Sequence, residues 1–111
     1  MKVIQVTVQR QDRYIRSIEI LGHAESGPYG YDLVCAGVSA VSIGAVNAVM
    51  ELSVIDMKVE QGGEGGYLNV AFPALLRDKE MEKAQLLLEG MLVSLRSIEN
   101  EYGKFIRIND K

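Results

Sequence analysis

The chain has 111 residues, with twelve basic and fifteen acidic side chains and a formal net charge of −3. This length fits one domain with a core of its own, so we expect residues 1–111 to form a single domain. One cysteine excludes an internal disulfide, and one cysteine with one histidine cannot build a structural zinc site. We therefore expect neither a metal nor another cofactor.

A mildly acidic chain lacks the basic stripe with which proteins bind nucleic acid, so we expect no direct nucleic-acid binding. Met1 and Lys2 lead directly into a segment interrupted by polar residues, which is not the pattern of a signal peptide. The most apolar stretch, residues 34–50, contains Ser39, Ser42 and Asn47 and is too short for a membrane span. These features predict a cytoplasmic protein without membrane association.

The first third of the chain predicts a hairpin followed by a loop. Apolar and polar residues alternate over residues 3–9, and residues 14–21 are rich in isoleucine, so both segments are predicted strands. The polar residues 10–13 between them predict the turn. Glycines and a proline then predict a loop as far as Tyr31. The loop positions of interest for substrate binding are Gly22, Gly27, Tyr29, Gly30 and Tyr31.

The apolar run over residues 33–51 is too long for a strand, and it predicts a helix with Asp32 as its N-cap. Because the run is apolar almost all round, we expect this helix to be buried on most sides. Small residues recur along it at spacings of three and four, which allows another backbone to approach closely. They are Gly37, Ala40, Gly44 and Ala48.

The rest of the chain predicts a second hairpin, a second helix and a last strand. Alternating residues 55–60 and 68–72 predict two strands around a glycine-rich turn at 61–66. Asp78 is predicted to begin an amphipathic helix that continues to about Asn100, with Gly103 as its stop. The apolar face of this helix is predicted to consist of Met81, Ala84, Leu88, Met91, Leu95 and Ile98.

Residues 105–108 predict the last strand, which completes the order β-β-α-β-β-α-β. Two hairpins with two amphipathic helices predict an α+β fold in two layers, with a mostly antiparallel sheet and the helices packed on it.

His23 and Cys35 are the residues that carry chemistry in this pattern. His23 lies at the predicted end of the second strand, and Cys35 lies in the first turn of the apolar helix, at about its third position. A helix N-terminus offers partial positive charge and unpaired N–H groups, which favour a thiolate over a thiol. A neighbouring imidazole would activate the sulfur further, and the N–H groups, including that of Cys35, would stabilise an oxyanion.

Each of these residues also has an ordinary interpretation, and spacing alone does not choose. A lone cysteine on an apolar helix is most often a small buried residue, and a histidine after a strand is most often a plain loop residue. Asp32 either caps the helix or orients the His23 ring as the third member of a triad. Ser39, one turn after Cys35, either supports the site or fills a tight helix contact. Tyr29 and Tyr31 either contact an aromatic substrate side chain or anchor the loop.

Two motifs resemble the signature of the ribosomal-processing cysteine proteases of the Prp family. They are Gly22-His23-Ala24 and residues 30–40, Gly-Tyr-Asp-Leu-Val-Cys-Ala-Gly-Val-Ser-Ala. The family pattern is Gly-His-Ala, a loop, and then Gly-x-Asp-Ile/Leu-Val-Cys-Ala-x-Val-Ser, and Gly37 departs from it only in standing where alanine is frequent. The chain length and the order of elements also resemble the family, so the resemblance covers the whole chain.

The resemblance implies a homodimeric endopeptidase that trims a short N-terminal extension from a basic large-subunit ribosomal protein, number twenty-seven. It implies Cys35 as the nucleophile, His23 as the general base, and cleavage after an aromatic residue. Asp32 and Ser39 also match family positions, with less defined roles. Two other functions remain open at this point: a non-catalytic ribosome-associated binding module, and a redox-sensing thiol protein.

Overall fold

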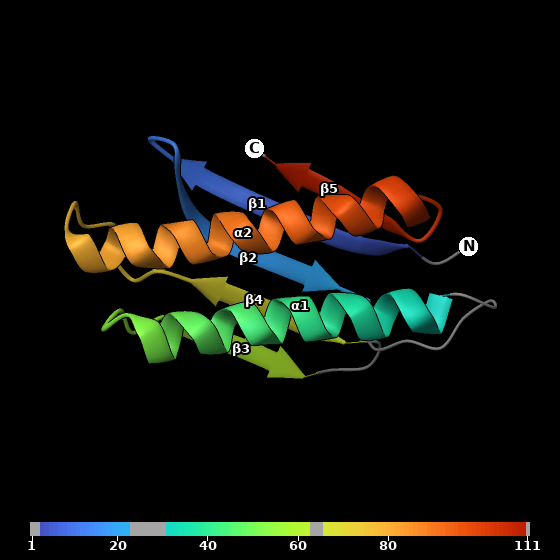
Figure 1. Cartoon of the computed structure of the whole chain (residues 1–111), viewed down its shortest axis with the longest axis horizontal. Coiled ribbons are helices and arrows are strands. Elements are labelled where there is room, and N and C mark those ends of the chain that lie inside the picture. The colour runs from blue at the N-terminus through green and yellow to red at the C-terminus, as the bar shows by residue number, and fades with distance from the viewer. Residues whose placement is uncertain (1–2, 23–30, 63–65, 111) are drawn as a thin grey trace.

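A computed structural model of the chain describes residues 3–22, 31–62 and 66–110, and Figure 1 shows how its elements are arranged. The order β-β-α-β-β-α-β is confirmed. The strands form one sheet in the order β3-β4-β2-β1-β5, in which only the β1–β5 pair is parallel. The elements are β1 (Ile4–Gln11), β2 (Tyr14–Leu21), α1 (Tyr31–Leu52), β3 (Lys58–Gly62), β4 (Tyr67–Ala71), α2 (Lys79–Tyr102) and β5 (Ile106–Asp110).

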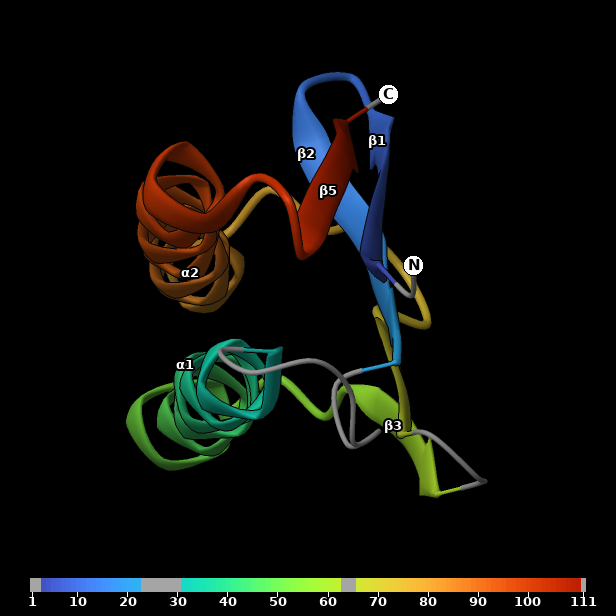
Figure 2. The same ribbon diagram turned by 90° about the vertical axis from the view of Figure 1, so that its right-hand side faces the viewer.

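Both helices cover the same face of the sheet, as Figure 2 shows with the helices on one side and all strands on the other. Helix α2 lies over the half of the sheet that contains β1 and β5, and α1 lies beside β3 and β4. This two-layer α+β architecture with a mostly antiparallel sheet is the predicted one. The core lies between the layers, and its fully buried side chains include Ile4, Ile18, Ile20, Leu88, Leu92 and Leu95.

The turn between β1 and β2 is shorter than the predicted turn at residues 10–13. Strand β1 continues to Gln11, and only Asp12 and Arg13 form the turn. Both have positive φ, at 51° and 74°, as a two-residue turn between right-twisted strands requires. The prediction was too long because neither residue is glycine, the usual signal for such a turn.

Helix α1 begins at Tyr31, before the predicted start, so Asp32 is its second residue and not its N-cap. The expectation that α1 is buried on most sides is also wrong. Its inner face is buried, including Val34, Val38 and Val49, but Leu33 is 69% exposed and Ile43 is 42% exposed. The reason is that a single layer of helices on a sheet leaves every helix with an outer face.

The stripe of small residues on α1 faces mostly outward. A Cβ added at Gly37 would lie 3.8 Å from the Ile98 side chain of α2, whereas one added at Gly44 would meet no atom within 4 Å. With 22 residues, α1 is long and apolar enough to cross a membrane by length and composition alone, contrary to the sequence estimate. Core helices meet the same test, and the inner face of α1 is part of the protein core.

The second hairpin starts later than predicted, because β3 covers Lys58–Gly62 while Ile55 and Met57 precede it. Helix α2 agrees well with its pattern. The Asp78 side chain accepts a hydrogen bond from the Met81 N–H at 2.8 Å, which confirms the N-cap, and Gly103 follows the last helical residue. Five of the six predicted apolar positions are buried, and Ile98 is half-buried.

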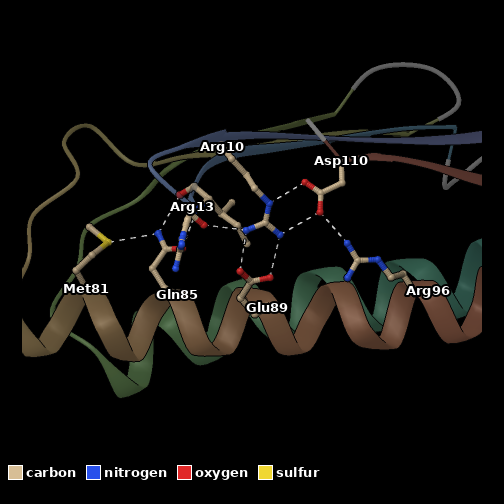
Figure 3. Close-up of polar contacts among 8 residues, drawn as sticks. Arg10, Arg13, Met81, Gln85, Glu89, Arg96 and Asp110 are labelled. Carbon is tan, nitrogen blue, oxygen red and sulfur yellow. Dashed lines mark hydrogen bonds and ion pairs between the residues drawn. The ribbon is translucent and has the colours of Figure 1, made fainter.

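Gln85 of α2 clamps the helix to the start of β2. Its side chain is buried, and its amide donates to the Ile15 carbonyl at 2.9 Å and accepts from the Ile15 N–H at 2.8 Å. Figure 3 shows this side chain on the helix among the polar contacts of the region. The amide therefore satisfies both backbone groups of a residue that has no exposed surface.

Arg10 joins β1, β5 and α2 through a group of ion pairs (Figure 3). Its guanidinium contacts the Glu89 carboxylate at 2.8 Å and the Asp110 carboxylate at 2.7 Å, and Arg96 contacts Asp110 from the helix at 2.7 Å. The Arg10 hydrogen bond to Asp110 is the main reason that the pKa of Asp110 lies below its usual value. These contacts hold the parallel edge of the sheet against α2.

Replacing Gln85 by leucine should destabilise the fold strongly, because two buried backbone groups lose their partner while the core keeps its volume. We expect the free energy of unfolding to fall by about 2–4 kcal/mol in urea titrations. The exposed Gln11 at the hairpin end provides the control, since Gln11→Leu should change stability by less than about 0.5 kcal/mol. Equal losses in the two variants would contradict the clamp.

Replacing Asp110 by asparagine should remove a pH-dependent part of the stability. The pKa of Asp110 is lowered by folding, so its contribution is fully present above the pKa of the unfolded chain and is lost as pH falls through the folded pKa. At neutral pH, Asp110→Asn should cost about 1 kcal/mol. Unfolding measured between pH 7 and 2 should show the two proteins converge at the acid end; a constant difference would contradict the ion-pair origin.

Candidate active site

The predicted site lies where β2 ends and α1 begins, at the right-hand end of the molecule in Figure 1. Gly22 is the residue that follows β2. Its N–H donates to the Gly66 carbonyl at 2.9 Å, which continues the pairing of β2 with β4 past the end of both strands. Its φ of +91° lies in the region that favours glycine, so a side chain here would strain the backbone. The sheet therefore fixes the chain immediately before His23.

Tyr31 is the first residue of α1 and not a loop residue as predicted. Its side chain has no exposed surface, and its ring meets Phe105 edge to face with 5.8 Å between the centroids. The hydroxyl donates to the Gly22 carbonyl at 2.9 Å. Of the two roles open for this tyrosine, these contacts favour the anchor, because the ring is buried against Phe105 and the hydroxyl is bonded to the backbone.

Cys35 lies beside the same carbonyl. Its sulfur is 3.5 Å from the Gly22 oxygen, in the geometry of a thiol that donates a hydrogen bond, and the residue is 5% exposed. Cys35 is the fifth helical residue and not the third. In an α-helix the N–H of the fifth residue pairs with the carbonyl of the first, which argues against the expected use of the Cys35 N–H as an oxyanion donor.

Asp32 and Ser39 flank Cys35 on the same helix. The Asp32 carboxylate is exposed and accepts from the Leu33 N–H at 3.0 Å, so it satisfies an amide of the first turn although it is not the N-cap. Ser39 lies one turn after Cys35 and is half-buried. Neither observation decides between the roles that the sequence left open for these two residues.

The remaining predicted site residues lie outside the described part of the chain. They are His23, Gly27, Tyr29 and Gly30. The pairing of Cys35 with His23 therefore stays a prediction. It draws on one observed link: the residue directly before His23 in the sequence is the one whose carbonyl contacts Cys35.

The structure also adds residues to the site that the sequence did not indicate. Phe105, which precedes β5, packs on Tyr31, and Gly66, which precedes β4, holds Gly22. Both come from segments far along the chain, and no local pattern marks them. A small apolar cavity of about 100 Å³ also lies beside the first turns of α1, lined by Leu33, Val34, Gly37, Ile98 and Tyr102.

A wider groove of about 640 Å³ lies at the opposite end of the molecule, where α2 begins. Its lining includes Tyr14, Arg77 and Lys83, and none of the predicted site residues that the structure describes is among its lining. Volume alone would favour this groove as the functional site. The chemistry points to the β2–α1 junction, because the chain's single thiol lies there.

Comparison with known proteins agrees with this location of the chemistry. The family model described as "Cysteine protease Prp" matches residues 3–107. The ribosomal processing cysteine protease Prp of Bacillus subtilis is 47% identical over 107 residues, which cover 96% of this chain and 96% of that protein. The Prp protein of Staphylococcus aureus is 38% identical over the full length of both chains.

Solved structures show the same fold. A crystal structure of a Streptococcus mutans protein matches with a TM-score of 0.89 and 33% identity, covering 98% of this chain and 94% of that one. The structure of the S. aureus protease Prp in complex with a substrate peptide matches with a TM-score of 0.83 and 37% identity over all of both chains. The chain therefore belongs to the Prp family and is a cysteine protease.

Proposed function

We propose that this protease removes a short N-terminal extension from large-subunit ribosomal protein number twenty-seven. Two relatives that match nearly or fully end to end are named ribosomal processing proteases, and one of the matching structures holds a substrate peptide. The observation within this chain that carries the proposal is the contact between Cys35 and the carbonyl of the residue before His23. It brings the only thiol to the strand end that bears the only imidazole.

The proposed reaction starts from the thiol form. The Cys35 S–H donates to the Gly22 carbonyl, so the proton must pass to His23 before the sulfur can attack. The thiolate then adds to the carbonyl carbon of the scissile peptide, and the carbonyl π electrons move to its oxygen. When this intermediate collapses, the C–N bond breaks and the His23 proton goes to the leaving amine.

Hydrolysis of the thioester completes the cycle. His23, now neutral, takes a proton from water, and the resulting hydroxide adds to the thioester carbon. The C–S bond breaks, the extension leaves as a carboxylic acid, and Cys35 regains a proton. N–H groups at the start of α1 would hold both oxyanions.

The buried position of Cys35 fits a site that opens on substrate binding. With 5% of the residue exposed, Cys35 offers little surface to a peptide carbonyl before substrate binds. We propose that the substrate exposes the sulfur when it binds, and that cleavage follows an aromatic residue, as the family resemblance implies. The net charge of −3 suits a basic ribosomal protein. We also propose a cytoplasmic location, without direct binding to nucleic acid or membranes.

We further propose a homodimer that forms through the outer face of α1. Exposed apolar side chains mark both helices, with Leu33, Ile43 and Met50 on α1 and Leu86 and Val93 on α2. Their surroundings differ. Between Asp32 and Glu51 no residue of α1 is charged, whereas the outer positions of α2 include Lys83, Glu82 and Arg96. An uncharged apolar face with small residues is the better match for a second copy of itself.

Replacing Cys35 by alanine should abolish cleavage of the extended ribosomal protein, because no other thiol exists in the chain. The measurement is incubation with the extended protein, followed by sequencing of the new N-terminus. The rate should fall by at least about 1,000-fold with binding retained. His23→Ala should lose cleavage to a similar extent.

Ser42→Ala is the matched control, since Ser42 is buried on the same helix two turns further on and its hydroxyl donates to the Val38 carbonyl within that helix. This variant should cleave at the wild-type rate. Function in cells that survives Cys35→Ala would instead support the non-catalytic binding module. Wild-type sensitivity to peroxide without cleavage would support the redox-sensing thiol.

The dimer is tested by placing one charge on each outer face. Ile43→Glu on α1 should convert the protein to a monomer in analytical ultracentrifugation, because an unpaired carboxylate would be buried in the seam. Val93→Glu on α2, which is 62% exposed, should leave the dimer intact. A monomeric wild type, or dissociation by Val93→Glu alone, would contradict this seam.

A further inference from the structure

The carbonyl of Gly22 accepts two hydrogen bonds from α1. The Tyr31 hydroxyl donates to it at 2.9 Å, and the Cys35 thiol approaches the same oxygen at 3.5 Å. The two donors are unequal, because a phenol O–H is a much stronger donor than a thiol S–H. One backbone oxygen therefore links the reactive sulfur to a buried tyrosine.

Tyr31 is held firmly enough to fix this oxygen. Its side chain has no exposed surface, and the edge-to-face contact with Phe105 sets the orientation of the ring. Gly22 is held from the other side, since its N–H bonds to Gly66. A Cβ at Gly22 would lie 3.4 Å from the Tyr31 oxygen, so the backbone and the phenol fit closely.

The carbonyl matters for the chemistry of the sulfur. A carbonyl oxygen beside Cys35 accepts from the S–H form, but it carries partial negative charge and repels a thiolate. When the sulfur loses its proton, the oxygen also loses the Cys35 donor. The Tyr31 hydroxyl remains, and it keeps the oxygen satisfied and offsets part of the negative charge that the oxygen presents to the sulfur.

We propose that Tyr31 is a positioning residue of the protease: its hydroxyl fixes the Gly22 carbonyl, so that Cys35 can release its proton and the backbone that leads into His23 keeps its orientation. Tyr31 acts on Cys35 through the Gly22 carbonyl. The effect on cleavage rests on the proposed function, whereas the effect on the reactivity of Cys35 does not.

The test is Tyr31→Phe, which removes the hydroxyl and keeps the ring that packs on Phe105. Without the phenol hydroxyl, the Gly22 oxygen keeps the S–H as a donor but loses the bond from Tyr31, so the thiol form is favoured. We expect alkylation of Cys35 by iodoacetamide near pH 7 to slow by about three- to tenfold, and its pH profile to move to higher pH. The single cysteine makes the modified site unambiguous in mass spectra. Cleavage should show kcat lowered about tenfold with KM changed less than twofold.

Tyr14→Phe is the matched control. Tyr14 is the first residue of β2, whereas Gly22 directly follows the last residue of that strand. The Tyr14 hydroxyl donates to the Glu82 carboxylate. An eight-residue strand places the two sites about 25 Å apart, so alkylation and cleavage should stay within twofold of wild type. Both variants should alkylate at the wild-type rate when unfolded in urea.

Two results would overturn the proposal. One is a Tyr31→Phe protein with an unchanged alkylation profile and unchanged kcat. The other is a loss of activity that follows the fraction of folded protein in thermal melts, with the alkylation profile unmoved, since that is the result of a purely structural role. If wild-type protein cleaves no extended ribosomal protein, the proposed substrate fails, while the alkylation comparison still decides the role of Tyr31.

Discussion

The central strand β2 is the constraint on which the rest of the molecule depends. It pairs with β1 on one side and β4 on the other, and both of its ends are fixed by groups from the helix layer. Gln85 holds the backbone near its start, and the Tyr31 hydroxyl holds Gly22 just past its end. Because these contacts satisfy backbone groups, they set the position of the strand and not merely its burial.

This constraint also explains how a small protein can present one thiol reliably. The sheet determines where Gly22 lies, and α1 determines where Cys35 lies, so the meeting of the two is a property of the whole two-layer fold. The ion pairs around Arg10 act at the other edge, where they keep β5 and α2 together and so support the Phe105 side chain beneath Tyr31.

The sequence patterns correctly predicted the features that depend on interactions between residues close together in the chain. Alternation located the strands, and the Asp78 cap with its apolar repeat located α2 to within a few residues. The prediction that α1 is buried on most sides failed because it depends on how the helix and sheet layers pack. The sequence of α1 is apolar enough for a buried helix, and only the assembled structure shows that its outer face is exposed. The glycine-rich segment also hid the true start of α1 at Tyr31, which displaced Asp32 and Cys35 within the helix. Gln85 was missed although it stands among the apolar positions of α2, because one polar residue there has many explanations.

The parallel pairing of β5 with β1 has a consequence for biosynthesis. It joins residue 4 to residue 106, and Arg10 reaches Asp110 across 100 residues of chain. During translation the free edge of β1 must therefore wait for nearly the whole sequence to leave the ribosome before it finds its partner. Until then it is an open strand edge, the type of surface that chaperones protect from aggregation. The β1 edge is consequently exposed to wrong pairing until β5 has been made.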